Sequence, residues 1–79
     1  MKINSRKLGT GLNFVQEIRR STKLTQEEFS LRYKIPMGTL RGWEQEAHQI
    51  PKMGLLYLHL IKNNPELIAN EVRKITARR

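Results

Sequence analysis

The sequence predicts an all-α domain of five helices. Apolar residues recur every three or four positions in several separate segments, and helix start signals precede most of these segments. We find no strand, internal repeat or low-complexity block. A chain of 79 residues is long enough for one domain, whose folding buries about 60% of the surface of the unfolded chain. We therefore expect one compact domain over residues 13–79, preceded by a basic arm over residues 1–12.

The first helix is predicted to begin after Asn13, a residue type that caps helix N-termini. Phe14, Val15 and Ile18 follow at i, i+1 and i+4, and the pattern fades near residues 21 and 22. This apolar stripe needs the next two helices to cover it.

Two further short helices follow, joined by a tight turn. Thr25 is predicted to cap the first of them, with Glu28 returning a bond to the cap amide. Pro36 suits the start of the next helix, where a missing N–H costs nothing, and it forces the chain to turn just before it. Leu40 and Trp43 share one face at i and i+3, which leaves the other faces free to meet a partner. This arrangement is the outline of a helix-turn-helix DNA reader.

The remainder of the chain predicts a loop and two more helices. A polar loop over residues 45–51 ends at a proline, and a densely apolar helix follows over residues 52–63. The Asn-Pro-Glu sequence at residues 64–66 is a strong start signal for a fifth helix. Down this helix the apolar positions recur at i, i+4 and i+7: Ile68, Val72 and Ile75.

The charge of the chain points to a polyanionic partner. Fifteen Lys and Arg against seven Asp and Glu give a formal net charge of +8 and a pI of about 10.5. Such an excess attracts nucleic acid first and a membrane surface second. No apolar run approaches the roughly 20 residues of a membrane span, and the N-terminus lacks the apolar region of a secretory signal. We therefore expect a cytoplasmic protein that does not bind membranes. Without cysteine, neither a disulfide framework nor a thiolate metal site is expected.

Residues 24–45 carry a more specific signal. The segment Leu24-Thr25-Gln26-Glu27-Glu28-Phe29 is followed by residues 35–45, which contain Ile-Pro, Gly-Thr-Leu-Arg and Trp-Glu. Together they resemble the second helix and the recognition helix of the Cro/cI-type (XRE) helix-turn-helix family, and the resemblance covers roughly residues 13–63. With Pro51, Leu60-Ile61 and the Asn-Pro-Glu sequence, they are similar to the antitoxin branch typified by HigA and to small regulators such as NadS.

Two residues depart from the family pattern. Lys34 stands at the turn, and Glu46 follows the recognition helix, at positions that the family usually fills with Gly. If either residue adopts a positive φ, its side chain costs roughly 1 kcal/mol of stability.

The predicted DNA contacts divide into two groups. Phosphate contacts are expected because amide and ammonium groups at a helix N-terminus, a turn and a basic arm suit the DNA backbone; these residues are Gln26, Gln45, Lys34, Lys2, Arg6 and Lys7. The arm is alternatively only a disordered chain start. Base contacts are expected from the recognition helix: Met37, Gly38, Thr39, Arg41 and Gly42.

Within the second group, each side chain has its own chemistry. Arg41 can read guanine bidentately, and Met37 can make apolar contact with a thymine methyl. The alternative for Arg41 is a phosphate contact or a solvated surface position. Gly42 lies inside a helix, where glycine costs about 1 kcal/mol relative to alanine, so we expect its backbone to approach DNA closely. The alternative is that the helix simply tolerates glycine at this position.

Other conspicuous residues favour structural roles. Trp43 is expected in the core and Glu44 as a structural acid at a helix end. His48 and His59 have no neighbours of the kinds that a metal site or a nucleophile requires, so we expect no enzyme activity, metal or cofactor.

The sequence thus predicts a transcriptional repressor that binds double-stranded operator DNA as a homodimer. Ile68, Val72 and Ile75 are expected to pair with a symmetry mate or to close the core. The resemblance implies the antitoxin of a type II toxin-antitoxin operon, with a RelE/HigB-like toxin as protein partner. The alternatives are a stand-alone phage or operon repressor and, from other classes, a basic RNA-binding protein or a protein-interaction module.

Overall fold

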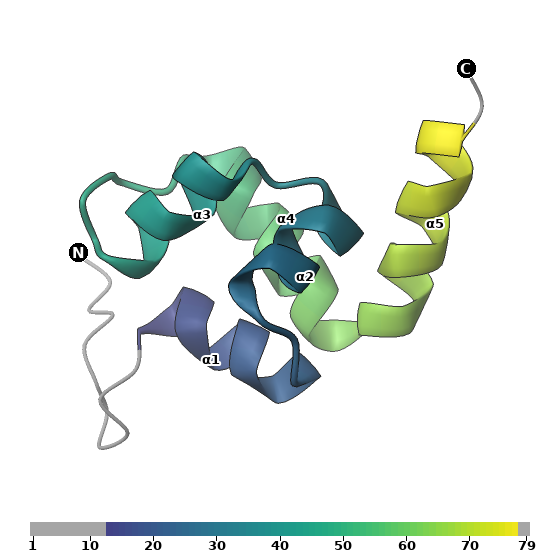
Figure 1. Ribbon diagram of the computed structural model, residues 1–79, viewed down its shortest axis with the longest axis horizontal. Coiled ribbons are helices and arrows are strands. Elements are labelled where there is room, and N and C mark those ends of the chain that lie inside the picture. The colour runs from purple at the N-terminus through teal and green to yellow at the C-terminus, as the bar shows by residue number, and fades with distance from the viewer. Residues whose placement is uncertain (1–12, 78–79) are drawn as a thin grey trace.

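The computed structural model describes residues 13–77, and within them the chain forms five helices and no strand (Figure 1). The helices are α1 (Phe14–Thr22), α2 (Gln26–Tyr33), α3 (Met37–Glu44), α4 (Lys52–Asn63) and α5 (Pro65–Ala77). The all-α prediction and the five predicted helices are confirmed. The predicted arm with Lys2, Arg6 and Lys7 lies outside the described residues.

Side-chain caps explain where α1 and α2 begin. Asn13 accepts a hydrogen bond from the Gln16 amide, and the Gln16 side chain returns one to the Asn13 amide. Thr25 and Glu28 form the same reciprocal pair at the start of α2, as predicted. Each of these reciprocal pairs, called a capping box, satisfies two backbone N–H groups that a helix N-terminus otherwise leaves unpaired.

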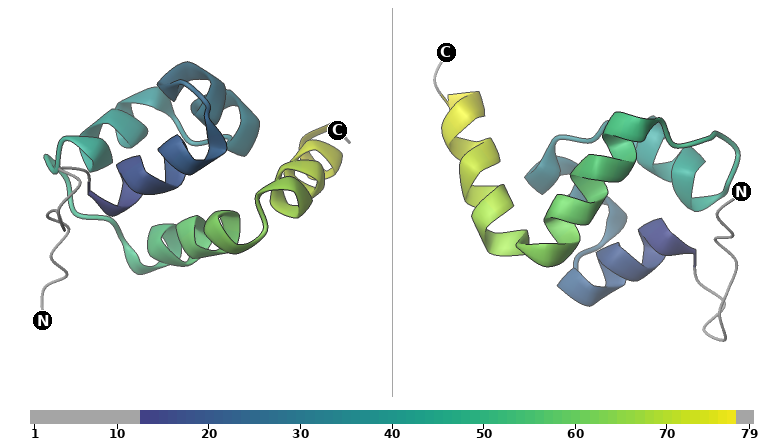
Figure 2. Two further views of the ribbon diagram at one scale, coloured as in Figure 1. Left: turned by 90° about the horizontal axis from the view of Figure 1, so that it is seen from below. Right: turned by 180° about the vertical axis from the view of Figure 1, so that it is seen from behind.

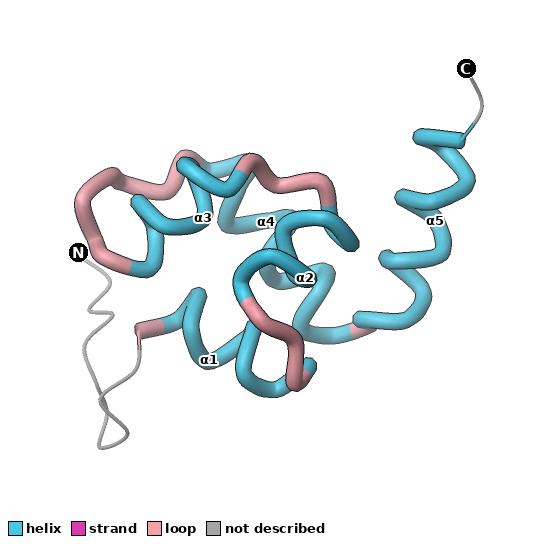
Figure 3. The backbone as a smooth tube through the Cα atoms, viewed as in Figure 1, coloured by secondary structure: helices cyan, strands magenta, loops and turns pink. Residues whose placement is uncertain are grey.

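The turn between α2 and α3 is fixed by hydrogen bonds as well as by Pro36. The Ile35 amide donates to the carbonyl of Ser30 at 3.1 Å, and the Ser30 hydroxyl donates to the Ile35 carbonyl at 2.6 Å. Pro36 occupies the N-cap position, so α3 begins one residue later. Figure 3 shows that this connection is short, whereas a longer loop, residues 45–51, joins α3 to α4.

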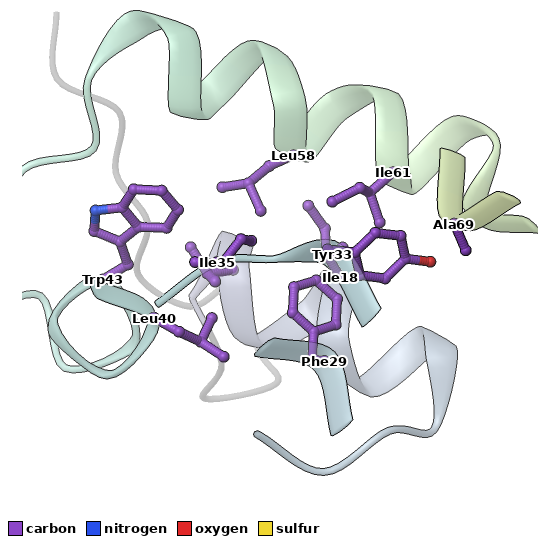
Figure 4. Packing of buried hydrophobic residues seen from close by; sticks show 10 residues of the cluster. Ile18, Phe29, Tyr33, Ile35, Leu40, Trp43, Leu58, Ile61 and Ala69 are labelled. Carbon is purple, nitrogen blue, oxygen red and sulfur yellow. The ribbon is translucent and has the colours of Figure 1, made fainter. Parts of the chain in front are cut away.

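The core lies where α1, α2, α3 and α4 meet (Figure 4). Its fully buried side chains come from all four of these helices and include Val15, Phe29, Tyr33, Leu40, Leu58 and Ile61. Trp43 is buried at the α3 end of this cluster, as predicted, and Ala69 of α5 closes the other end. Burial of these apolar side chains is the main stabilising term for so small a domain.

Two tyrosines tie the C-terminal helices to α2. The Tyr33 hydroxyl donates to the carbonyl of Pro65, the first residue of α5, at 2.9 Å. The Tyr57 hydroxyl, from α4, donates to the carbonyl of Tyr33 at 2.8 Å. Burial raises the pKa of both phenols above their ordinary value.

Helix α5 contacts α2 and α4, and its C-terminal end lies farthest from the other helices (Figures 1 and 2). Ile68 packs against the core and Val72 is partly buried, whereas the Ile75 side chain is exposed. The described part of the chain contains no helix long and apolar enough to cross a membrane.

Candidate nucleic-acid interface

Helix α3 presents polar side chains that nothing in the fold uses. Thr39 is half-buried, while Arg41 and Gln45 are exposed. None of these three side chains makes a hydrogen bond, an ion pair or another electrostatic contact with a residue between 13 and 77. Met37 lies half-buried and Gly38 exposed at the start of the same helix. The outer surface of α3 is therefore chemically free for a partner.

The inner surface of α3 is held in two ways. Leu40 and Trp43 anchor it in the core, on the face that the i, i+3 spacing predicted. Glu44, its last residue, is buried and holds an ion pair with Arg19 of α1. The Arg19 Nε atom lies 2.6 Å from one carboxylate oxygen of Glu44 and the Nη2 atom 3.0 Å from the other. This bidentate geometry fixes both distance and orientation.

The same carboxylate also holds the N-terminus of α2. Gln26, the first residue of α2, donates from Nε2 to Glu44 Oε1 at 2.9 Å. Asn13 completes the arrangement, because its Nδ2 atom donates to the Glu44 carbonyl at 2.8 Å. The network of Asn13, Arg19, Gln26 and Glu44 therefore locks the end of α3 to the starts of α1 and α2. The hydrogen bonds that Arg19 donates to the Glu44 carboxylate raise the pKa of the Arg19 guanidinium above its ordinary value.

Comparison with known proteins gives one informative match. No family model and no curated protein matches the chain. A solved structure described as an HTH XRE-family like protein from Agrobacterium tumefaciens is similar, with 48% sequence identity and a TM-score of 0.74. The match covers 76% of this chain and 97% of that one. The chain belongs to the XRE family of helix-turn-helix proteins. Its class is therefore that of the DNA-binding transcription regulators, as the sequence predicted.

The XRE helix-turn-helix brings several of the predicted contact residues together. Gln26 is only half-buried, and one N–H of its amide is used by Glu44, so the second N–H is left for a phosphate. Gln45 is the residue directly after Glu44 and forms the C-cap of α3. The network thus links the two predicted phosphate contacts to a single buried anchor.

Lys34 and Glu46, which stand where the XRE family usually has Gly, both adopt a positive φ. Lys34 ends α2 with φ 55°, and Glu46 follows α3 with φ 60°. Lys23, at the end of α1, has the same left-handed conformation with φ 64°. Lys34 is exposed, and its ammonium group has no partner within the described part of the chain. The charge at this turn therefore remains available, at a cost in backbone strain.

Gly42 requires a correction. The sequence predicted a base contact at Gly42, with simple tolerance of glycine as the alternative to a close approach of DNA. Gly42 is buried instead, and a Cβ placed there would overlap the imidazole ring of His48. The close approach is thus made by an imidazole of the same chain. The loop after α3 folds back, with the Ala47 amide donating to the Gly42 carbonyl at 2.8 Å. Gly42 is not available for the predicted base contact, because His48 covers it.

Sequence reasoning missed two residues of this site. Arg19 gave no signal, since either Arg19 or Arg20 was able to pair with a buried acid and the sequence does not choose between them. In the sequence, His48 suggests only a metal ligand or a partner of a nucleophile. A glycine six residues earlier is compatible with packing of the His48 ring on the Gly42 backbone, but only the path of the loop establishes that contact. The described residues hold no cluster that would bind a metal ion.

Proposed function

We propose that this XRE protein is a sequence-specific transcriptional repressor that inserts α3 into the major groove of operator DNA. The proposal rests on one observation. The outer side chains of α3 have no partner among the described residues, while the end of the same helix is fixed by the buried ion pair between Glu44 and Arg19. In this proposal Arg41 reads guanine, and Thr39 and Met37 contact neighbouring base edges. Phosphate contacts come from Gln26, Gln45, Lys34 and, on the arm, Lys2, Arg6 and Lys7. The function is exercised in the cytoplasm and needs no cofactor.

The experiment is selection of duplexes from a random-sequence library by the purified full chain. A repressor enriches one site, and a palindromic site indicates two copies related by a two-fold axis. With on the order of 6–10 phosphate contacts, affinity for that site falls ~10³–10⁵-fold between about 50 and 200 mM salt. Enrichment of no sequence, with tighter binding to RNA than to any duplex, would favour the RNA-binding alternative.

We further propose that the repressor binds as a homodimer through α5. A helix-turn-helix dimer must hold its two recognition helices some 34–36 Å apart, which requires an interface outside α3. Of the three predicted residues, Ile68 and Val72 are partly engaged with the domain, and Ile75 is the exposed one. An Ile75→Asp variant should sediment as a monomer with unchanged helix content. A monomeric wild-type chain at micromolar concentration would contradict the α5 dimer.

The antitoxin role is the finer part of the proposal. Its support is the resemblance to the HigA branch, together with three exposed apolar side chains on one face of α4, at i, i+3 and i+7: Met53, Leu56 and Leu60. A RelE/HigB-like toxin is the proposed partner for this face. The test is co-expression with the product of the adjacent gene. If the adjacent gene product arrests growth and this protein relieves the arrest, the antitoxin role is supported. If the adjacent gene product is harmless on its own, the stand-alone repressor is favoured.

A further inference from the structure

Three glycines lie inside helices of the described chain, and the fold explains two of them. Gly42 is covered by the His48 ring. A Cβ on Gly54, in α4, lies 3.0 Å from both Cγ2 of Ile50 and Cη2 of Trp43, so a side chain there would press on the core. At both positions the absence of a side chain is a packing requirement of the monomer.

Gly38 has no such explanation. It is the second residue of α3 and exposed, and a Cβ built on it meets nothing within 4 Å. Its φ is not in the left-handed region, so its backbone conformation does not call for glycine either. A glycine within a helix is less favourable than alanine, because it loses more conformational freedom on folding. The isolated domain would therefore be more stable with a side chain at this position.

The surroundings of Gly38 indicate what the open space receives. Met37 and Thr39 are half-buried on either side of it, and Arg41 follows one turn later on the exposed surface. Pro36 supplies no side-chain cap, so the first turn of α3 carries no capping side chain between its backbone and the solvent. The open space over Gly38, between the half-buried Met37 and Thr39, suits a small apolar group, and the thymine C5-methyl group is the apolar group that protrudes into the major groove.

We infer that Gly38 is a specificity-determining residue, whose missing side chain leaves room for the methyl group of one operator thymine. The inference rests on the proposed function, since it assigns a base to one position of the proposed reading helix. It makes Gly38 a position where stability of the free domain is traded against close approach to DNA.

The test uses the best duplex that the wild-type chain selects from a random library. The variant is Gly38→Ala, and the matched control is Asn63→Ala, which introduces the same residue at the exposed C-terminal end of α4. Thermal unfolding is measured for each chain, as is the Kd for the selected duplex. Kd is also measured for duplexes in which each thymine in turn is replaced by deoxyuridine, which lacks the methyl group.

Gly38→Ala should raise the unfolding midpoint by about 2–6 °C and weaken binding to the selected duplex roughly tenfold. At one thymine, replacement by deoxyuridine should weaken wild-type binding and restore binding by the variant, because the alanine methyl then fills the space. Asn63→Ala should leave Kd and its deoxyuridine profile unchanged.

Three results overturn the inference while leaving the proposed function intact: unchanged affinity of Gly38→Ala, a loss that no deoxyuridine position restores, or a lower unfolding midpoint, which would make Gly38 a requirement of the fold. If the wild-type chain enriches no duplex at all, the proposed function itself fails, which is a separate and recognisable result.

Discussion

The Arg19 guanidinium and the Glu44 carboxylate form a bidentate ion pair that joins α1 to the last residue of the recognition helix. The Glu44 side chain is 2% exposed and that of Arg19 16%, so the pair is largely shielded from water. A buried pair of this kind is not by itself evidence of high stability, because desolvation offsets much of the attraction. Its consequence is geometric: α3 is held in one orientation relative to α1 and α2.

Removing one partner of this pair should be severe. Arg19→Ala leaves the Glu44 carboxylate buried with Gln26 alone, and we expect it to lower the free energy of unfolding by about 3–5 kcal/mol. Urea unfolding followed by the fluorescence of Trp43, the sole tryptophan, measures the change. Arg20→Ala is the control, since Arg20 is exposed in the same helix, and it should change stability by less than about 0.5 kcal/mol. Equal effects of the two substitutions would show that the ion pair contributes nothing.

Glycine at residue 34 should stabilise the domain. Lys34 has φ 55°, a conformation that a Cβ disfavours, so Lys34→Gly is expected to raise the free energy of unfolding by about 1 kcal/mol. Lys34→Ala removes the same ammonium group but keeps the Cβ, and it should bring no such gain. If the two variants unfold at the same urea concentration, backbone strain at this turn is not a significant term.

Alkaline pH should weaken the domain through its buried phenols. The pKa of Tyr33 is raised in the folded state by burial, so the unfolded chain loses that proton first as the pH passes about 10. Stability is therefore complete below that pH and falls as the pH rises through the higher folded pKa. Tyr33→Phe should lose about 1 kcal/mol at neutral pH, with its bond to Pro65, and show a shallower alkaline decline. Unfolding curves at several pH values test both effects, and an unchanged alkaline slope would contradict the assignment.

Loss of the Arg41 side chain should relax sequence discrimination. Arg41→Ala is expected to weaken binding to the selected duplex by ~1–3 kcal/mol and to abolish the preference at one guanine, with no change in stability. Lys34→Ala serves as comparison, because a phosphate contact should weaken binding to all duplexes alike and lower the salt dependence. Should Arg41→Ala lose affinity equally for selected and random duplexes, Arg41 contacts a phosphate and not a base.

Local rules were sufficient to predict the helices and the inner face of α3. The Thr25 and Glu28 box, Pro36 and Pro65 act within one turn of the chain, so their effects on helix starts are readable from neighbouring residues. The spacing of Leu40 and Trp43 likewise determined which side of α3 is buried. The positive φ at Lys34 and Glu46 followed from the family resemblance and not from a local rule, because the family usually has Gly at these two positions.

Contacts between distant segments were decided only by the tertiary structure. The sequence did not choose Arg19 over Arg20 as the partner of Glu44, because that choice depends on how α1 rotates against α3, 25 residues away in the chain. It left Gly42 between a close approach to DNA and simple tolerance of glycine, whereas the path of the loop over α3 brings His48 onto it. It left α5 between core and dimer interface, and the packing of Ala69 with the exposure of Ile75 divides that helix in two. Periodicity and capping act locally, but long-range pairing is set by the simultaneous packing of all five helices.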